Sequence, residues 1–551
     1  MHERKTRYAI VVILAITSWM APLCAAEEVS RGGVYSVVEI SFRGPTQEPT
    51  ETPARDIAFW VVFQHESGSP EYKVHGFWDG DGKGGISGDV FNVRFCPTKT
   101  GRWNLVEVGS NASELSGQRK GDCIIATPSD HPGFWVIDPD SPGQRWYMRS
   151  DGSHQYIFGN THYSFVSGYK QGNKPSGNDI ASDIAGNAKY FKKLRFGIHG
   201  DRYPHPTEKP FFDDSGGPTD WGDFSHRPNP RWFHERVDAA VRTAYEHDLI
   251  ADLILAGPDT EESRSTLRAQ QNGGDATPYL KYIAARYGSY PNVWLCLCNE
   301  YDIKKPNYSE KEIARFGQTI RRFLPYPTPL SVHNTPSILW STKFDELPAW
   351  NDHQIVQNKL RNLAQAADVI QFTWENPKGK GPRNKPTIND ELSYQGAGDG
   401  HSEGDTIESH LGAFLGGGYA TTGEKSGNKE GQYFWGKFDP SQHTAADNLK
   451  WLREVIDENI TFWRMSPDLS IFSNFDDGFR GMSWAGHEYI LGTNRPHNGI
   501  VANLPPGEWT VTRYDVVAKE ATKLSETAKG RFMFNSPDSR AVLFHFIRNR
   551  D

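Results

Sequence analysis

The chain has 551 residues, which is more than one ordinary domain holds, and this length predicts two to four domains. A charged fraction of 23% with a net charge of −8 argues against a protein that binds nucleic acid or another polyanion. Aromatic residues make up 13% of the chain, including 17 Trp and 22 Tyr, and their flat faces suit sugar rings as well as β-rich cores.

The first residues have the pattern of a cleaved secretory signal. Basic residues within positions 4–7 precede an apolar run over 8–20, and Cys24-Ala-Ala then supplies small residues for cleavage. We expect residues 1–26 to be removed and the mature protein to be secreted or periplasmic. Lipid attachment is disfavoured, because Leu23 stands where a lipoprotein signal has a small residue. No later segment approaches the ~20 apolar residues of a membrane span, so membrane insertion is not expected.

Residues 27–145 are predicted to form an N-terminal β-sandwich. Short alternating segments are separated by clusters of Gly, Pro, Asp and Ser, as in sandwich domains. The predicted strands cover 34–42, 57–63, 72–78, 91–95 and 101–108. Cys96 and Cys123 lie in this region, where an oxidising compartment would allow a disulfide, and the sequence leaves open whether they pair.

Between residues 146 and 464 the pattern changes to strands that alternate with helices. The strand candidates cover 156–162, 196–202, 249–256, 293–300, 329–334, 369–375, 386–391 and 418–424, with helices at 231–247 and 309–323 among those between them. Eight such units over about 300 residues are typical of a (β/α)8 barrel. Cys296 and Cys298 alternate along one strand, so we expect buried free thiols there. Residues 465–551 lose the helical period and predict a small C-terminal β-sandwich.

Two of the predicted barrel strands end in a glutamate. Val-Trp-Leu-Cys-Leu-Cys precedes Asn299-Glu300, and Lys-Pro-Thr-Ile-Asn precedes Asp390-Glu391. Active sites of such barrels lie at the C-terminal strand ends, and a pair of carboxylates there can cleave a glycosidic bond. One carboxyl must donate a proton to the leaving oxygen, and the other must meet the anomeric carbon as an anion. Asp390 is the close rival of Glu391 for the second role.

An ordered set of motifs resembles the apiosidase-like barrels among the clan A retaining glycoside hydrolases. The set runs Gly76-Phe-Trp-Asp-Gly-Asp81, Val93-Arg-Phe-Cys-Pro97, Gly101-Arg-Trp103, Gly159-Asn-Thr-His162, Asn229-Pro-Arg-Trp-Phe233 and Leu295-Cys-Leu-Cys-Asn299-Glu300-Tyr301-Asp302. The resemblance covers nearly all of the mature chain, and it implies a small β-sandwich on each side of the barrel. It further implies that Glu300 is the general acid/base and Glu391 the nucleophile. Related barrels often read Gly-Asp-Thr-Ala-Trp where this chain has Gly159-Asn-Thr-His-Tyr163, which puts any transfer of sugar specificity in doubt.

Other polar and aromatic residues near the predicted strand ends are candidates for binding substrate. They are Asn299, His162, Arg202, His333, Asn334, Trp374, Tyr394, Glu424 and Trp435. Asn299 could hydrogen-bond a sugar 2-hydroxyl, and Arg202 could orient Glu391 or hold an acidic sugar. Glu375 and Glu424 are weaker carboxylate candidates, and His199 lies on predicted strand two.

The chemistry predicted is the retaining hydrolysis of a poly- or oligosaccharide without a cofactor. A Gly-x-Ser-x-Gly elbow, phosphate loops and His pairs at metal-ligand spacing are absent from the sequence, so no metal is expected. Two alternatives remain. One is an inverting hydrolase or a lyase that acts on an acidic polysaccharide, and the other is a barrel that binds carbohydrate without catalysis.

Overall fold

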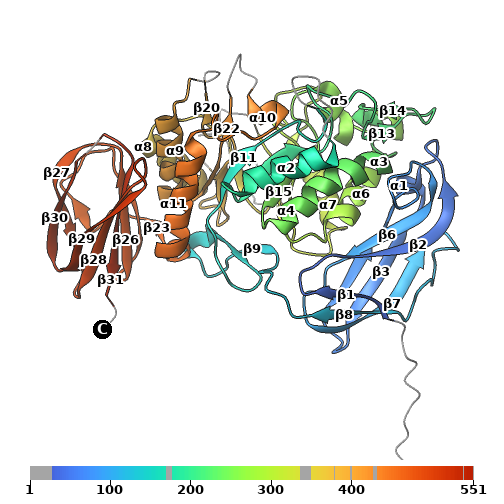
Figure 1. The fold of residues 1–551 in the computed structure, drawn as a ribbon, viewed down its shortest axis with the longest axis horizontal. Helices are drawn as coiled ribbons and strands as arrows, with labels where there is room; N and C mark the ends of the chain where they lie inside the picture. Colours follow the sequence, from blue (N-terminus) through green and yellow to red (C-terminus); the bar gives the residue numbers. More distant parts are fainter. Residues whose placement is uncertain are drawn as a thin grey trace, which may run out of the picture.

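The computed structural model describes residues 28–168, 176–334, 349–377, 379–396, 400–425, 431–537 and 539–549. A central α/β barrel lies between two β-sheet regions, an N-terminal one in blue and a C-terminal one in red (Figure 1). The predicted signal segment falls outside the described residues. Among the described residues, no helix combines the length and apolar character needed to cross a bilayer.

The N-terminal region is built from two facing sheets. One has five strands in the order β1 (Glu28–Gly33), β8 (Cys123–Thr127), β7 (Gly101–Ser110), β3 (Phe59–His65), β4 (Glu71–His75), and the other has β2 (Val38–Gln47), β6 (Gly88–Phe95) and β5 (Phe77–Trp78). Their alternating apolar residues form one core, in which Phe63, Val93 and Trp103 are fully buried. Cys96 and Cys123 are both buried free thiols, so the disulfide left open by the sequence is not formed.

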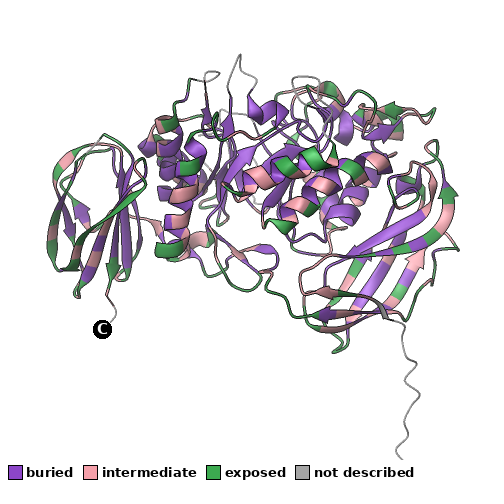
Figure 2. Cartoon of the chain, viewed as in Figure 1, coloured by how far each residue is buried: buried purple, intermediate pink, exposed green. Residues whose placement is uncertain are grey.

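The barrel sheet has eight parallel strands. In the order in which they occur along the chain, these are β11 (Phe158–Thr161), β12 (Lys193–Gly197), β15 (Ile250–Ile254), β16 (Val293–Cys296), β17 (Leu330–Ser331), β18 (Gln354–Val356), β19 (Thr387–Asn389) and β21 (Tyr419–Thr421). β11 pairs with both β12 and β21, which joins the first strand to the last. Cys296 and Cys298 are buried and free, as predicted. The predicted (β/α)8 fold is confirmed, and its strands are buried (Figure 2).

Helices pack around this sheet. They include α2 (Gly177–Ala188), α4 (Asp238–Glu246), α6 (Thr277–Tyr287), α7 (Glu310–Arg321), α8 (Leu363–Glu375), α9 (Glu403–Leu415) and α11 (Ala445–Asn459). α2, α7 and α9 each begin with a capping box, in which a serine and an acidic residue three positions later satisfy free backbone N–H groups. Short helical turns α3 (Pro230–Trp232) and η3 (Phe233–Val237) precede α4, so the predicted helix at 231–247 is confirmed.

Predicted strand six is wrong, because residues 369–375 belong to α8 and the sixth strand is β18. The buried residues Leu363, Ala366, Ala367 and Ile370 recur at helical spacing, and the Asn362 side chain caps the helix by accepting from Ala364 and Gln365 N–H. A short apolar run cannot be assigned to helix or strand by periodicity alone, and the predicted segment contained only the second half of this helix. β18 has only three residues and begins with a polar glutamine.

Predicted strand two also begins earlier than expected. β12 starts at Lys193 rather than Phe196, and all of its residues are buried. Lys193 and Arg195 face the barrel interior, where they are paired with acidic or polar groups. Charged residues of this kind break the apolar run by which a buried strand is recognised in a sequence.

Further β-structure lies at the N-terminal ends of the barrel strands and after the barrel in the chain. The hairpin of β9 (Trp135–Ile137) and β10 (Tyr147–Arg149) packs Trp135 and Tyr147 against Trp294 at the start of β16. The C-terminal region has a six-stranded sheet, made of β23 (Ser466–Pro467), β25 (Arg480–Trp484), β26 (Glu488–Thr493), β31 (Val542–Arg548), β28 (Trp509–Asp515) and β29 (Glu520–Ala528). A second sheet of β24 (Phe472–Ser473), β27 (His497–Asn503) and β30 (Arg531–Ser536) lies against it.

Candidate active site

Glu300 lies in the turn after β16 with an unusual backbone conformation. Its φ is 43°, in the left-handed region that is unfavourable for residues other than glycine. Arg264 stabilises this turn, because its guanidinium donates to the carbonyl oxygen of Asn299 at 2.6 Å and to that of Glu300 at 3.2 Å. Strained residues held by their surroundings occur often at functional sites. The strain at Glu300 therefore supports a role for this side chain beyond packing.

One amide nitrogen bridges the two predicted catalytic glutamates. Gln357, which follows β18, donates from Nε2 to Glu300 Oε1 at 2.9 Å and to Glu391 Oε2 at 2.7 Å. Because both oxygens contact the same nitrogen, the distance between Glu300 Oε1 and Glu391 Oε2 cannot exceed the sum of these two distances. The carboxyl groups of Glu300 and Glu391 thus share one small site at the C-terminal ends of β16 and β19.

The second oxygen of Glu391 is surrounded by donors. The Tyr163 hydroxyl donates to Oε1, while Arg195 Nη1 and His333 Nε2 lie 3.6 Å and 3.8 Å from it. Burial raises the pKa of Glu391; Arg195 opposes this rise and the nearby Glu300 adds to it. Burial, together with the charge of Arg195, holds the pKa of His333 well below its usual value. His333 is therefore neutral, and the positive charge that acts on Glu391 comes first from Arg195 and then from Lys359.

Arg195 also sets the position of Asn299. Its Nη2 donates to Asn299 Oδ1, and its Nη1 donates to the Tyr163 hydroxyl at 2.9 Å. Because the amide oxygen of Asn299 accepts from Arg195, the amide nitrogen is left as a donor. The site thus combines an amide donor, a buried guanidinium and two carboxylates.

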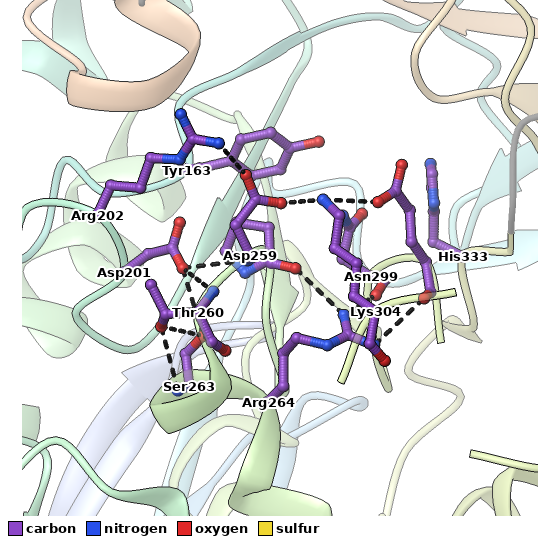
Figure 3. A network of polar contacts seen from close by, with 12 residues as sticks. Tyr163, Asp201, Arg202, Asp259, Thr260, Ser263, Arg264, Asn299, Lys304 and His333 are labelled. Carbon is purple, nitrogen blue, oxygen red and sulfur yellow. Dashed lines mark hydrogen bonds and ion pairs between the residues drawn. The ribbon is translucent and has the colours of Figure 1, made fainter. Parts of the chain in front are cut away.

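A chain of ion pairs leads from Glu300 to the rim of the barrel. Lys304 Nζ lies 2.7 Å from Glu300 Oε2 and also pairs with Asp259, whose other oxygen lies 3.0 Å from Arg202 Nη2. Figure 3 shows Asp259 between Arg202 and Lys304. Burial lowers the pKa of Lys304, but the carboxylates of Asp259 and Glu300 outweigh it and raise that pKa above its usual value. Lys304 therefore stays charged beside Glu300.

Asp390 is held away from the glutamates. Its carboxylate pairs with Lys193 and accepts from the Thr421 hydroxyl at 2.6 Å inside the barrel. These groups outweigh the effect of burial and hold the pKa of Asp390 below its usual value. Because β19 ends at Asn389, the strict alternation of a strand does not extend to Asp390 and Glu391. Both side chains point inward, Asp390 toward Lys193 and Glu391 toward Tyr163.

The structure brings several of the predicted binding residues to this site. Asn299 and His333 contact the groups around Glu391, and Asn334 follows His333 as a buried residue. The Tyr394 hydroxyl lies 3.4 Å from that of Tyr163. Their roles in binding substrate stay predictions.

Other predicted binding residues lie elsewhere. His162 and Tyr163 follow the end of β11; the His162 ring faces Asn187 of α2, while the Tyr163 hydroxyl reaches Glu391 inside the barrel. Trp374 lies in the last turn of α8, at the opposite face of the barrel, where Nε1 donates to the Gly143 carbonyl and the ring stacks on Arg145. Arg202 pairs with Asp259, so it does not orient Glu391, which was one of its two suggested roles; Arg195 lies beside Glu391 instead, and the second role, binding of an acidic sugar, stays a prediction.

The remaining candidates make contacts with the surrounding structure, and substrate binding by Glu424 and Trp435 stays a prediction. Glu424 accepts from the Gln432 N–H at 3.0 Å and so supports α10 (Gln432–Trp435), which Trp435 ends. Glu375 is exposed on α8 and accepts from Gln371. The His199 ring lies 2.8 Å from the Leu255 carbonyl oxygen, in the layer between strand and helix.

Four residues of the site were not predicted from the sequence. Tyr163 was only the residue after a predicted strand, and Arg195 interrupted an apolar run. Gln357 follows the strand that was misplaced, so it drew no attention. Lys304 lies four residues after Glu300, a spacing that carried no signal without the turn geometry.

Comparisons with known proteins agree with the fold. Residues 198–410, which include both glutamates, match the family described as apiosidase-like, catalytic domain, and residues 32–107 match a domain of unknown function, DUF5060. A crystal structure from Bacteroides vulgatus, provisionally assigned as a glycoside hydrolase, is similar with a TM-score of 0.71 and 20% identity over 95% of this chain and 100% of that one. No curated protein matches the chain at a significant level.

Two further solved structures share the barrel. A family 5 glycoside hydrolase from Bacteroides vulgatus has a TM-score of 0.58 and 13% identity over 76% of this chain and 94% of that chain. A structure described as a glycoside hydrolase has a TM-score of 0.57 and 15% identity, with 76% and 98% covered. The apiosidase-like match and the fold shared with these structures together support a glycoside hydrolase. Within the described residues, no group of three or more His, Cys, Asp or Glu side chains is arranged to hold a metal ion.

Proposed function

We propose that the protein is a retaining glycoside hydrolase that acts on a poly- or oligosaccharide by double displacement. The observation that carries the proposal is the Gln357 nitrogen that donates to both glutamates, at 2.9 Å and 2.7 Å. Retaining pairs lie about 5–5.5 Å apart, whereas inverting pairs leave room for a water at roughly 6.5–9.5 Å. Two carboxylates that share one donor fit the shorter spacing.

In the first step, Glu391 attacks the anomeric carbon while Glu300 gives its proton to the leaving oxygen. Arg195 and Tyr163 favour the ionised form of Glu391, because each donates to or faces its Oε1 oxygen. Glu300 accepts from the same Gln357 nitrogen as Glu391, so both carboxyl groups can act on one glycosidic bond. Lys304 Nζ lies 2.7 Å from Glu300 Oε2 and can balance the negative charge that Glu300 carries once it has given its proton to the leaving oxygen.

In the second step, Glu300 takes a proton from water, and this water releases the sugar from Glu391. The amide nitrogen of Asn299 can donate to a sugar 2-hydroxyl, a contact that strengthens in the transition state. Neutral His333 can accept from or donate to a further hydroxyl. All of these groups come from this chain's own side chains.

The proposal is tested with a panel of neutral and acidic polysaccharides and aryl glycosides. Wild type is compared with Glu391→Ala, Glu300→Gln and the control Glu375→Gln, which changes an exposed glutamate on α8. We expect the two site variants to lose activity by at least about 10²–10⁴-fold, as for removal of a general acid or base, and the control to keep it. NMR of the first product should show the anomeric configuration of the substrate.

Other outcomes point to the alternatives. A product of opposite configuration would indicate an inverting enzyme, and an unsaturated product would indicate a lyase. Glycan binding by wild type without turnover on any substrate would indicate a binding barrel. We also infer that the protein is exported. Mass spectrometry of the exported protein should then give the mass of a chain that starts at residue 27.

A further inference from the structure

A cavity of about 440 Å³ lies beside the glutamate site on the same face of the barrel. Its walls come from the loop after β12, the loop after β15 and the segment around β14 (Pro218–Thr219). Glu300 follows β16, the next strand of the barrel after β15. The cavity therefore lies next to the catalytic pair around the rim.

The cavity wall is connected to Glu300 through side chains. Arg202 lines the cavity and pairs with Asp259, which pairs with Lys304, which in turn pairs with Glu300. The lining of the cavity and the glutamate site are thus connected by contacting side chains along the rim.

An aromatic side chain is exposed in the cavity. Trp221 lines it and is 42% exposed, although tryptophan is usually well buried. Its loop is fixed on both sides: Lys209 pairs with Asp220 at 2.5 Å, and Gly222 lies so close to Thr266 that a Cβ would approach the Thr266 nitrogen to 2.3 Å. The residues on both sides of the exposed indole are thus held by contacts with the rest of the chain.

Unused hydrogen-bond acceptors lie beside this indole. Asp201 is only 4% exposed; its Oδ1 accepts from Thr260 and Asp259 N–H groups, whereas its Oδ2 has no partner among the described residues. Figure 3 shows the second oxygen pointing away from these contacts. Asp220 Oδ1 is likewise without a partner in the described part of the chain. Buried acceptors normally have a donor, so both oxygens call for hydroxyl or water hydrogens.

The charge of the cavity disfavours an anionic ligand. Asp201, Asp220 and Glu262 line it together with two cations, Arg202 and Lys209. Both cations already pair with carboxylates, Arg202 with Asp259 and Lys209 with Asp220. A uronate or a sulfated sugar would meet excess negative charge here, while a neutral sugar can donate its hydroxyls to the free oxygens.

We infer that this cavity is a second sugar subsite, in which Trp221 stacks on a neutral sugar unit and Asp201 and Asp220 accept from its hydroxyls. The inference rests on the proposed function and narrows it to neutral glycans with more units than the cleavage site alone can hold. Affinity and turnover should therefore increase with chain length up to the unit that reaches Trp221.

The test uses neutral cello-, xylo-, manno- and galacto-oligosaccharides of two to six units, with oligogalacturonates as the anionic comparison. Binding is measured by calorimetry on Glu391→Ala, alone and combined with Trp221→Ala, Trp221→Phe or the control Trp484→Ala. Trp484 is similarly exposed, at 36%, but lies on the C-terminal sheet. For at least one neutral series, we expect longer chains to bind at least about tenfold more tightly than the dimer.

We expect Trp221→Ala to remove this gain, Trp221→Phe to keep part of it, and Trp484→Ala to keep all of it. A gain that survives Trp221→Ala, or affinity that does not change with length, overturns the subsite. Tighter binding of oligogalacturonates than of every neutral series overturns the assignment of ligand class.

Turnover separates this inference from the proposed function. If wild type hydrolyses a neutral glycan but Trp221→Ala loses no more on long chains than on short ones, the subsite is wrong and the hydrolase stands. If wild type hydrolyses nothing while Trp221-dependent binding remains, the hydrolase is wrong and the sugar-binding cavity stands.

Discussion

At the scale of single residues, the two glutamates of the site differ in the charged and polar groups that surround them. Burial of Glu391 opposes its ionisation and raises its pKa. The positive charge of Arg195 and the hydrogen bond from the Tyr163 hydroxyl act in the opposite direction. Glu300 instead faces a lysine that is tied to Asp259. Two identical side chains thus have different surroundings, and different surroundings are what assign different roles to paired carboxylates.

This arrangement predicts where activity falls at acid pH. In the proposed double displacement Glu391 acts in its ionised form, and its pKa is raised by burial, so kcat/KM should increase with pH through a value above the usual 4.5. Tyr163→Phe removes a donor that favours the ionised form, which raises this pKa further. The acid limb of kcat/KM should therefore move to higher pH, by about one pH unit for a hydrogen bond to a charged group.

The matched control for this profile is Tyr279→Phe. Tyr279 is a buried phenol on α6 that donates to the Leu255 carbonyl at 2.7 Å and does not contact Glu391. Its variant should keep the wild-type acid limb. An unmoved limb in Tyr163→Phe would show that another group sets the pH dependence.

At the scale of elements, the sixth barrel strand was predicted within helix α8, and the true strand, β18, was missed. β18 has three residues and supplies Gln357 immediately after its end, while α8 carries the longer apolar run. Trp374 consequently belongs to the packing of α8 against the segment before β10, through Gly143 and Arg145. A structural role for Trp374 has a different experimental signature from a role in binding sugar.

Trp374→Ala should lower the free energy of unfolding and leave KM unchanged. The ring centroid lies 3.6 Å from the Arg145 guanidinium carbon, and the indole N–H donates at 3.1 Å. Loss of a cation–π contact and of one hydrogen bond should lower stability by about 2 kcal/mol, measured by urea unfolding. A raised KM at unchanged stability would instead return Trp374 to the substrate site.

The sequence indicated the parts of the site that depend on local order. Glu300 and Glu391 follow apolar strands, so their place at the barrel mouth could be predicted from one segment each. Arg195 and Gln357 could not, because their importance comes from contacts with residues 104 and 34 positions away. His162 was misassigned because the predicted strand gave no reason to prefer Tyr163 for the inward position.

At the scale of the whole molecule, buried ion pairs join the N-terminal sandwich to the barrel. Arg94 of β6 pairs with Asp238 of α4 at 2.5 Å, and Arg286 of α6 pairs with both Asp238 and Asp79. Burial raises the pKa of Asp238, but the two guanidinium groups outweigh this effect and hold that pKa below its usual value. The sandwich is therefore fixed to two barrel helices.

Asp238→Asn should destabilise the protein strongly at neutral pH. The change leaves two buried arginines short of a counter-charge, and breaking a buried pair lowers stability by about 3–5 kcal/mol. The control is Arg43→Ala, which breaks a surface pair with Asp89 and should change stability by about 1 kcal/mol or less. Equal unfolding midpoints for the two variants would contradict this view of the interface.

The Gln357 bridge has a consequence for the timing of the reaction. A charged carboxylate is a stronger acceptor than a protonated or esterified one, so the amide favours whichever glutamate is ionised. In the proposed double displacement, that is Glu391 before attack and Glu300 once the sugar is attached. One side chain, without moving between rotamers, would thus support the two glutamates in alternation as their roles exchange.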